Sequence, residues 1–427
     1  MIGVIKNNLQ AALEAIALAV VTDRNNAYYS RVRLHAEDGK LWLYASSDLM
    51  SVRLPIGANV KTPFDTTVSH DALATFIGAL KDLEEINIVM EIDDTALKVR
   101  CGKISQHFAT LPAANFPLVQ GPGSEVGVSL STSALHTTAE IGGLFALAEK
   151  NPSDPTLACV RLLFRQTSSG QMLTLTSTDK FKAVSAGMTI SGAPEVWLDK
   201  PILVPVSSLQ KGITLMRKLG EESVTIAFPD EHRVQIVTAN VTVNIMRGAG
   251  TFPAIDEVFK RAVKAASVTL PLGLLKTAVK VAKIANARCA LNVSPTEVAL
   301  TNNGDGDAKG THFPIPCSVE GEAMKVFVDL TILEKIIGAI QTAGAESIAL
   351  EFGGPLKNIK ARCGASDKPL PIVMQAIFGV LSPDDPKAKT AAKNKKGKPA
   401  KDETAAPAQP EAEAEKAEVE VEEAEVA

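Results

Sequence analysis

The chain carries the stretch Glu222-Ser-Val-Thr-Ile-Ala-Phe228, and two similar stretches lie at long intervals on either side of it. They are Glu85-Ile-Asn-Ile-Val-Met90 and Glu346-Ser-Ile-Ala-Leu-Glu-Phe352. Each follows a helical pattern and opens a run that alternates between apolar and polar residues, which is typical of β-strands. Because self-similarity at a long period indicates repeated units, the spacing predicts three copies of one unit of about 125 residues.

A second set of predicted strands also occurs three times, each time as a hairpin around a turn that contains Gly or Pro. The paired segments are 31–35 with 41–48, 160–164 with 173–179, and 290–293 with 298–303. Helical patterns lie between the strands and begin near Asn7, Ser69, Ser131, Ser207, Pro271 and Asp329. The Ser and Asp residues among these starts are types that commonly cap a helix N-terminus. The sequence therefore predicts an α+β fold in which each unit packs two helices on antiparallel sheets.

The predicted boundaries give three folded domains, at 1–120, 124–260 and 264–381, followed by a tail at 382–427. The tail holds seven lysines between Lys387 and Lys401, and from Asp402 onward ten acidic residues against the single Lys416. Blocks of charge with few large apolar side chains cannot offset chain entropy by burial, so we expect the tail to be disordered. It is either a solubilising extension or a segment whose lysine half contacts DNA transiently.

The charge balance limits the ways in which the chain can bind nucleic acid. The whole sequence has 44 Lys and Arg against 48 Asp and Glu, a net charge of −4. The tail contributes 8 and 12 of these, which leaves 36 of each sign in residues 1–381. This balance excludes a protein that grips nucleic acid through bulk positive charge. Aromatic residues make up only 4% of the chain, which argues against a base-stacking surface for single strands.

The residues that carry chemistry are scattered. The five cysteines form no C-x-x-C pair and the six histidines form no cluster, which favours a reduced intracellular protein without a metal site. No secretory signal or membrane-spanning pattern is present, so we expect a cytoplasmic protein. Neither common phosphate-binding loop is found and no catalytic set stands out. We therefore expect no cofactor and no enzyme activity; a catalytic site assembled at domain junctions is an alternative that no sequence feature supports.

Two predicted helices have basic faces. In the helix after Pro271, Lys276, Lys280 and Lys283 fall on one side. The opposite, sheet-facing side is predicted to hold Leu274, Leu275, Ala278, Val281, Ala282 and Ala285. In the helix near Ser207, Lys211 and Arg217 project away from an apolar stripe. These faces are either solvated surface or a surface that faces a polyanion.

Three further segments carry a resemblance to a known family. They are Leu111-Pro-Ala-Ala-Asn-Phe-Pro117, Thr178-Asp-Lys-Phe-Lys-Ala-Val184 and Arg247-Gly-Ala-Gly-Thr-Phe-Pro253. In this order and spacing they resemble the L-P-x-x-x-F-P, T-D-x-x-R-L-A and D-G-x-F-P-D-Y segments of the bacterial DNA polymerase III beta subunit, the sliding-clamp family. The resemblance covers residues 1–381 and implies three clamp-type domains per chain. Two chains would form a head-to-tail ring around duplex DNA, with helices lining the hole.

The function that the resemblance implies is that of a non-catalytic processivity factor, which tethers the replicative DNA polymerase and is loaded by clamp-loader subunits. The DNA-contacting residues would be Arg24, Lys211, Arg217, Lys276, Lys280 and Lys283. The pocket for partner peptides would comprise Thr178, Lys180, Phe181, Lys182, Ala183, Pro253, Val258, Met374, Ile377, Phe378, Gly379, Val380 and Leu381. Ala183 and Val258 could instead serve only to close domain cores, and Arg24 could be an ordinary loop charge.

The chain also departs from the family pattern near this pocket. Asp256 and Glu257 stand where the family usually has arginines, and Ile377-Phe-Gly-Val-Leu381 replaces the usual M-P-x-R-L end. These departures predict a different peptide specificity. The competing hypothesis is a ring-forming or polymeric scaffold that does not enclose DNA, in which the lysine faces are merely exposed to solvent.

Overall fold

The structure is a computed structural model that describes residues 1–23, 25–83, 86–93, 96–123, 126–148, 154–261, 264–303, 310–364, 370 and 372–382. Apart from Ser382, the predicted tail lies outside the described residues. The body up to Pro383 forms one compact unit, so the boundaries at 1–120, 124–260 and 264–381 stay predictions. In the described part of the chain, no helix is long and apolar enough to cross a membrane.

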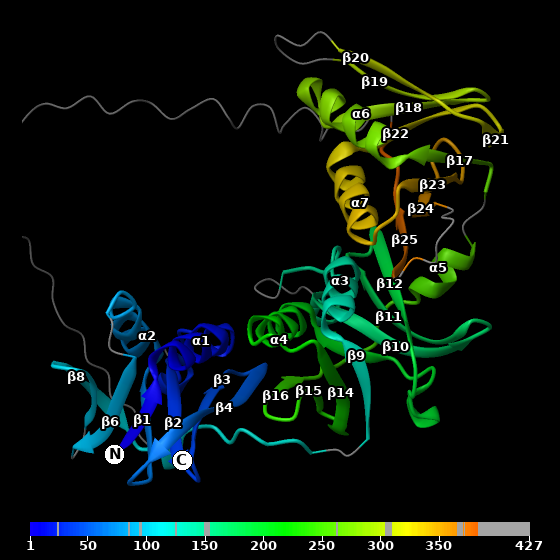
Figure 1. The fold of residues 1–427 in the computed structure, drawn as a ribbon. Helices are drawn as coiled ribbons and strands as arrows, with labels where there is room; N and C mark the ends of the chain where they lie inside the picture. The colour runs from blue at the N-terminus through cyan, green and yellow to red at the C-terminus, as the bar shows by residue number, and fades with distance from the viewer. Residues whose placement is uncertain are drawn as a thin grey trace, which may run out of the picture. The chain divides into compact units, whose positions relative to one another are not determined.

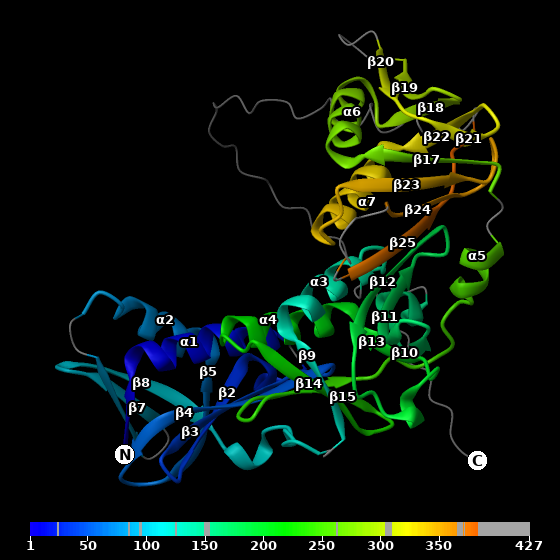
Figure 2. The ribbon, with the colours of Figure 1, turned by 45° about the vertical axis from the view of Figure 1, so that its right-hand side comes forward.

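The body consists of one element order used six times: a strand, a helix and three further antiparallel strands (Figures 1 and 2). In the first repeat these are β1 (Ile2–Ile5), α1 (Lys6–Ile16), β2 (Arg31–Glu37), β3 (Lys40–Ser46) and β4 (Met50–Val60), then β5 (Phe64–Ser69), α2 (His70–Ala79), β6 (Asn87–Asp93), β7 (Ala96–Cys101) and β8 (Ile104–Leu111). Within it β1 pairs with β6, and β5 pairs with β2, so each half completes the sheet of the other.

The second and third repeats have the same order. The second contains β9 (Gly127–Ser131), α3 (Thr132–Gly142), β10 (Cys159–Thr167), β11 (Gly170–Thr178) and β12 (Lys182–Ile190), then β13 (Ile202–Pro205), α4 (Val206–Lys218), β14 (Ser223–Asp230), β15 (Arg233–Val237) and β16 (Thr242–Met246). The third contains β17 (Ala266–Pro271), α6 (Leu272–Ala285), β18 (Arg288–Ser294), β19 (Glu297–Asn302) and β20 (Thr311–Pro316), then β22 (Met324–Asp329), α7 (Leu330–Thr342), β23 (Ser347–Phe352), β24 (Ile359–Cys363) and β25 (Ile372–Phe378). The α+β prediction, with helices packed on antiparallel sheets, is confirmed.

A few elements lie outside this order. The short helix α5 (Ile255–Arg261) lies on the connection between the second and third repeats, and β21 (Val319–Gly321) pairs with β17 (Figure 1). Single 3-10 turns occupy η1 (Ala17–Ala19), η2 (Ala27–Ser30), η3 (Ala113–Asn115), η4 (Pro155–Ala158) and η5 (Glu195–Trp197).

The helix N-termini agree with the predicted caps in three places and differ in one. Ser69, Ser131 and Asp329 each accept a hydrogen bond from a backbone N–H in the first turn of α2, α3 and α7. Ser207 is not a cap, because α4 begins one residue earlier and its N-cap is Pro205. The strand β13 runs directly into α4, so the helix starts where the backbone leaves the sheet rather than at the serine.

Strand pairs between repeats join the sheets. β4 of the first repeat pairs with β16 of the second, with Val52 opposite Val243. β12 of the second repeat pairs with β25 of the third over seven residue pairs, from Lys182 opposite Phe378 to Met188 opposite Ile372. In both junctions the last strand of a repeat's first half pairs with the last strand of the next repeat's second half.

The helices make one continuous row of contacts, in the order α2, α1, α4, α3, α7 and α6. In α6 the residues that face the core are Leu275, Ala278, Val279 and Ala282, all at most 1% exposed. The prediction that Leu274 and Val281 also face the sheet is wrong, since they are 39% and 38% exposed. Their positions place them a quarter turn or more from the buried stripe.

Candidate functional site

The turn between β11 and β12 contains four of the predicted pocket residues and is fixed by its own hydrogen bonds. Thr178 Oγ1 accepts a hydrogen bond from the Lys180 N–H at 3.0 Å and donates one to the Lys182 carbonyl at 2.8 Å. Asp179 Oδ1 accepts from the N–H groups of Phe181 and Lys182. Lys180 takes a left-handed conformation with φ of 78°, which the turn requires. The buried Thr178 is therefore the structural base of the turn.

At the tip of this turn the Phe181 side chain is 84% exposed. The flanking lysines are paired: Lys182 Nζ with the Asp179 carboxylate, and Lys180 Nζ with Asp154 Oδ2 at 3.2 Å. An ordered turn holds this large aromatic side chain in water, so covering it with a partner protein would contribute favourable binding free energy. The turn thus presents an apolar contact point with much of the local charge already neutralised.

Beside the turn lies an apolar cluster that is separate from the two main cores. It consists of Ala183, Ile255, Phe259 and Ile377, with Phe252 packed against it. Ala183 and Ile377 lie directly opposite each other in the β12–β25 pair, while Ile255 and Phe259 come from α5. Val258 on the same helix is 40% exposed and Pro253 is half-buried just before it. The second and third repeats and their connection therefore meet at one small apolar surface.

Asp256 anchors α5 to the sheet. Its carboxylate accepts a hydrogen bond from Arg161 Nη2 at 2.6 Å and is also bonded to Arg165 Nη2. Although burial opposes ionisation, hydrogen bonds and charge from Arg161 and Arg165 lower the pKa of Asp256. The Arg161 guanidinium also lies over the Phe252 ring, 5.5 Å from its centroid. The acidic residue that departs from the family pattern thus has a structural role at this site.

The sequence interpretation missed Arg161, Arg165, Ile255 and Phe259. One signal was available for Arg161: it lies between Val160 and Leu162 in the buried first part of β10, where a charge requires a partner. Ile255 and Phe259 are spaced by four residues, which places them on one helix face.

The predicted residues of the C-terminal strand do not all lie at the apolar cluster. Met374 and Phe378 are 1% exposed and belong to the core of the third repeat, whereas Ile377 points to the cluster. Gly379, Val380 and Leu381 are half-buried beyond the strand. Leu381 donates its N–H to the Phe327 carbonyl, which directs the chain end towards β22. Of the predicted pocket residues, the structure therefore brings Ala183 and Ile377 together in the cluster. Phe181 and Val258 are exposed on the turn before β12 and on α5, the elements that carry the cluster, and Pro253 directly precedes α5 in the chain.

The predicted DNA-contacting residues lie on two helices of the row, and Arg24 lies outside the described residues. On α4, Lys211 is exposed and Arg217 Nη1 donates a hydrogen bond to His136 Nε2 of α3 at 2.9 Å. On α6, Lys276 donates to Gln341 of α7 at 2.6 Å, Lys283 pairs with Glu334 of α7, and Lys280 is exposed. The helix row thus has cationic groups, of which Lys283 is already neutralised.

Among the described residues no group of three His, Cys, Asp or Glu could hold a metal ion. The five cysteines are all unbridged, and Cys101, Cys159 and Cys289 are buried. Burial raises the pKa of the Cys289 thiol to about 11, so it is protonated at neutral pH.

Comparison with known proteins finds similar sequences and similar folds. Residues 2–120 match the family described as DNA polymerase III beta subunit, N-terminal domain. A curated relative, the beta sliding clamp of Caulobacter vibrioides, is 25% identical over 339 residues, which are 76% of this chain and 87% of the relative.

Solved structures share the fold of the body. The DNA polymerase sliding clamp of Bacillus subtilis is 15% identical, with a TM-score of 0.78 over 89% of this chain and 98% of its own. The sliding clamp of Caulobacter crescentus is 19% identical, with a TM-score of 0.76 over 89% and 99%. Another structure of the C. crescentus clamp, 18% identical with a TM-score of 0.78 over the same shares, has polyethylene glycol at a region described as tethering the beta motif.

Proposed function

We propose that this chain, which has a DNA polymerase III beta subunit domain at residues 2–120 and the sliding-clamp fold throughout its body, is a DNA sliding clamp. It acts as a non-catalytic processivity factor: it encircles duplex DNA and keeps the replicative polymerase attached. The observation that carries this proposal is the continuous row of helices over antiparallel sheets in three tandem repeats, on a chain related over 339 residues to a beta sliding clamp. We place it in the cytoplasm, with clamp-loader subunits as further partners.

The strand pairing within the chain supports a closed ring of two chains. Both internal junctions join the last strand of one repeat's first half to the last strand of the next repeat's second half, as β4 to β16 and β12 to β25. Two strands at the corresponding positions have no such partner in the described part of the chain: β20, the last strand of the third repeat's first half, and β8, the last strand of the first repeat's second half. Among the described strands β20 ends its sheet. β8 pairs with β7 along one edge and meets β5 only at Thr110 and Leu111 along the other, so each strand has an edge open to further pairing. Pairing β20 of one chain with β8 of a second satisfies both edges and, applied twice, closes a ring.

The helix row supports the same closure. At each internal junction the first helix of one repeat contacts the second helix of the next: α1 contacts α4 and α3 contacts α7. By that rule α6 should contact α2 of the second chain. The outward side of α6 carries Leu274, Val281 and Ile284, which are 39%, 38% and 78% exposed and recur at helical spacing. An apolar stripe of this kind is costly in water and is the surface that a second copy would cover.

The modest charge of the helix row suits a protein held on DNA by enclosure. Each phosphate contact by a Lys or Arg adds about one unit to the salt dependence of binding and holds the protein in place. In this body Lys283 and Glu334 neutralise each other, while Lys211 and Lys280 stay exposed. A few such charges keep the duplex centred without stopping it from sliding.

The apolar cluster at α5 and the Phe181 turn are the proposed docking site for partner peptides. An extended peptide can place apolar side chains against Ala183, Val258 and Ile377 and cover Phe181. The related clamp from C. crescentus, in which a tethering region holds polyethylene glycol, supports a binding site in this fold. The polymerase and the clamp loader would use this surface in turn.

The decisive experiment compares retention on nicked circular DNA with retention on the same DNA after linearisation. Clamp loader, ATP and the full chain are mixed with each substrate, and protein that stays on the DNA is measured after gel filtration. We expect retention on the circle and rapid loss from the linear form, because an enclosing ring slides off free ends. Equal retention on both substrates, or on neither, would support the scaffold hypothesis instead.

A further inference from the structure

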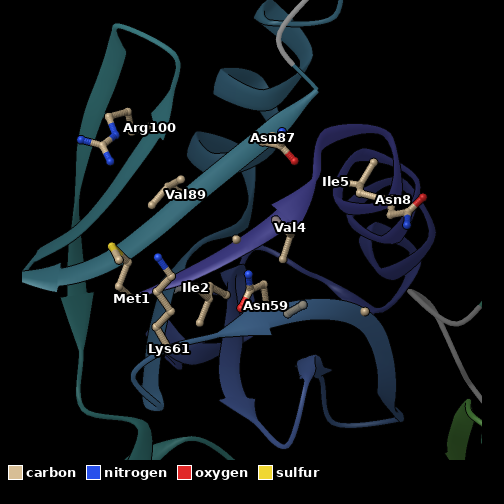
Figure 3. A pocket seen from close by; sticks show the side chains of 13 residues that line it. Met1, Ile2, Val4, Ile5, Asn8, Asn59, Lys61, Asn87, Val89 and Arg100 are labelled. Carbon is tan, nitrogen blue, oxygen red and sulfur yellow. The ribbon is translucent and has the colours of Figure 1, made fainter.

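The outer part of the first repeat has a hollow of about 540 Å³ between β1, β4, β6 and the start of α1 (Figure 3). Its walls combine apolar and polar groups. The residues that line it are Met1, Ile2, Gly3, Val4, Ile5, Asn8, Gly57, Ala58, Asn59, Lys61, Asn87, Val89 and Arg100. A volume of this size holds several side chains of a bound peptide.

Among the described residues that line this hollow, every ionisable side chain is positively charged. Lys61 and Arg100 are exposed, and the Met1 backbone nitrogen donates a hydrogen bond to the Thr62 carbonyl at 3.0 Å. None of the thirteen lining residues is Asp or Glu. Figure 3 shows Lys61 next to Met1, with Val89 and Arg100 further along the same side. The hollow therefore concentrates positive charge beside an apolar wall that includes Ile5, which is 47% exposed.

The third repeat contains the counterpart of this hollow and serves as an internal comparison. There β17, β23 and β24 take the places of β1, β6 and β7, and a hollow of about 550 Å³ lies at the corresponding position. Lys360-Ala-Arg362-Cys363 corresponds to Lys98-Val-Arg100-Cys101, so Arg362 is the counterpart of Arg100.

The two hollows differ in charge. In the third repeat Arg362 pairs with Glu351 at 3.2 Å, and Lys264 lies 3.5 Å from Glu320. Both carboxylates line that hollow, so its cations are neutralised within the chain. In the first repeat Glu91 is the counterpart of Glu351, but it pairs with Lys98 at 3.3 Å and is not among the residues that line the hollow, so Arg100 and Lys61 have no carboxylate among the described lining residues. The missing negative charge is what a ligand would supply.

We propose that the hollow of the first repeat binds an acidic peptide segment in which carboxylates flank an aliphatic side chain. The carboxylates would pair with Lys61 and Arg100, and the aliphatic group would cover Ile5 and Val89. A peptide fits better than DNA, because the hollow has an apolar wall and is lined mainly by strands, with Asn8 the one residue of α1 among those that line it. The site is separate from the apolar cluster at α5 and does not depend on the proposed clamp function.

The test uses the full-length chain and a fluorescein-labelled Glu-Leu-Glu-Leu peptide, with binding followed by fluorescence anisotropy. We expect Lys61→Glu combined with Arg100→Glu to weaken binding by about tenfold or more. The matched control, Lys264→Glu with Arg362→Glu, makes the same change in net charge at the counterpart hollow and should leave binding unchanged. Lys61→Gln with Arg100→Gln keeps the side-chain bulk and should weaken binding as well, which separates lost affinity from misfolding.

Four outcomes would overturn the proposal. These are no binding by the natural chain, equal loss in both charge-reversed variants, equal binding of a Gln-Leu-Gln-Leu peptide, and complete competition by inorganic phosphate at the concentration of the peptide. Absence of binding means that the hollow has no such ligand, and equal loss in both charge-reversed variants indicates an effect of bulk charge. Equal binding of the Gln-Leu-Gln-Leu peptide indicates that only the apolar wall binds, and complete competition by phosphate indicates a simple anion site.

Discussion

Arg161 on β10 donates a 2.6 Å hydrogen bond to the carboxylate of Asp256 on α5, which joins two positions 95 residues apart in the chain. Because α5 has only seven residues, its own hydrogen bonds cannot hold it in place. The bond to Arg161, the second bond to Arg165 and the burial of Ile255 and Phe259 therefore fix the wall of the apolar cluster.

Asp256→Asn should loosen α5. The substitution removes the negative charge and leaves Arg161, which is 8% exposed, without its ionic partner. We expect a loss of about 2 kcal/mol in the free energy of unfolding and about a tenfold weaker affinity for a polymerase-derived peptide. Urea unfolding and peptide anisotropy measure the two effects. Glu257→Gln on the same helix, an exposed position, is the control, and an equal effect of both changes would contradict the role of Asp256.

The same contact has a defined dependence on pH. The pKa of Asp256 is lowered in the folded chain, so its stabilisation is complete above the ordinary carboxyl pKa of about 3.9 and is lost as the pH falls through the folded value. We expect the stability difference between the natural chain and Asp256→Asn to be constant from pH 6 to 8 and to shrink only in acid. Urea midpoints at a series of pH values measure it. A difference that already disappears near neutral pH would argue against an ionised Asp256.

Phe181→Ala should weaken peptide binding without lowering stability. The side chain is 84% exposed, so its removal creates no cavity, while the turn is held by Thr178 and Asp179. Aromatic residues at the centre of an interface commonly contribute about 2 kcal/mol, which corresponds to about a thirtyfold change in affinity. Val196→Ala, another exposed apolar position, is the control. Unchanged peptide affinity in Phe181→Ala would place the partner elsewhere.

Ile284→Asp should prevent dimer formation. Ile284 is 78% exposed on the side of α6 that we expect to meet α2 of the second chain, and a carboxylate there would be desolvated in the ring. We expect the dimer dissociation constant to rise by about a hundredfold or more. Sedimentation equilibrium measures the mass, and Leu356→Asp, 70% exposed elsewhere in the third repeat, should remain dimeric. A dimer that survives Ile284→Asp would rule out this contact.

Local patterns predicted the elements of this fold well. The hairpins appear in the structure as β2–β3, β10–β11 and β18–β19, because alternation and turn residues act over short distances. Ser69, Ser131 and Asp329 cap helices for the same reason. Ser207 does not, because the preceding strand β13 is fixed by its pairing with β10, a contact that local sequence cannot reveal.

The sequence patterns could not predict contacts between segments that are far apart in the chain. The pairing of Ala183 with Ile377 and the bond between Arg161 and Asp256 each depend on how whole repeats are placed. Helical spacing predicted one lysine face on α6 but could not tell that Lys283 meets Glu334 of α7. It also assigned Leu274 and Val281 to the core, since spacing alone does not distinguish an exposed apolar stripe from one that faces the sheet.

Lys280→Glu should affect DNA more than Lys283→Glu. Lys280 is exposed, whereas Lys283 pairs with Glu334. The positive charge of Lys283 is therefore neutralised within the protein. In a loading assay on nicked circles, we expect Lys280→Glu to lower retention several-fold, with the deficit larger at low salt. Lys283→Glu should instead lower stability, because it places two carboxylates together. The opposite order of effects on DNA retention would show that the Lys283–Glu334 pair opens when DNA is present.

We expect His136 to make the contact between α3 and α4 sensitive to mild acid. Its ring accepts a hydrogen bond from Arg217, and burial followed by the charge of Arg217 lowers its pKa, although Glu140 acts in the other direction. A lowered pKa means that the unfolded chain takes up the proton more readily, so stability falls as the pH drops below the ordinary value of about 6.5. Protonation also removes the acceptor and releases Arg217. We expect the urea midpoint of the natural chain to fall more between pH 7.5 and 5.5 than that of His136→Gln, which does not titrate. Equal decreases in the two proteins would assign the acid sensitivity to other groups.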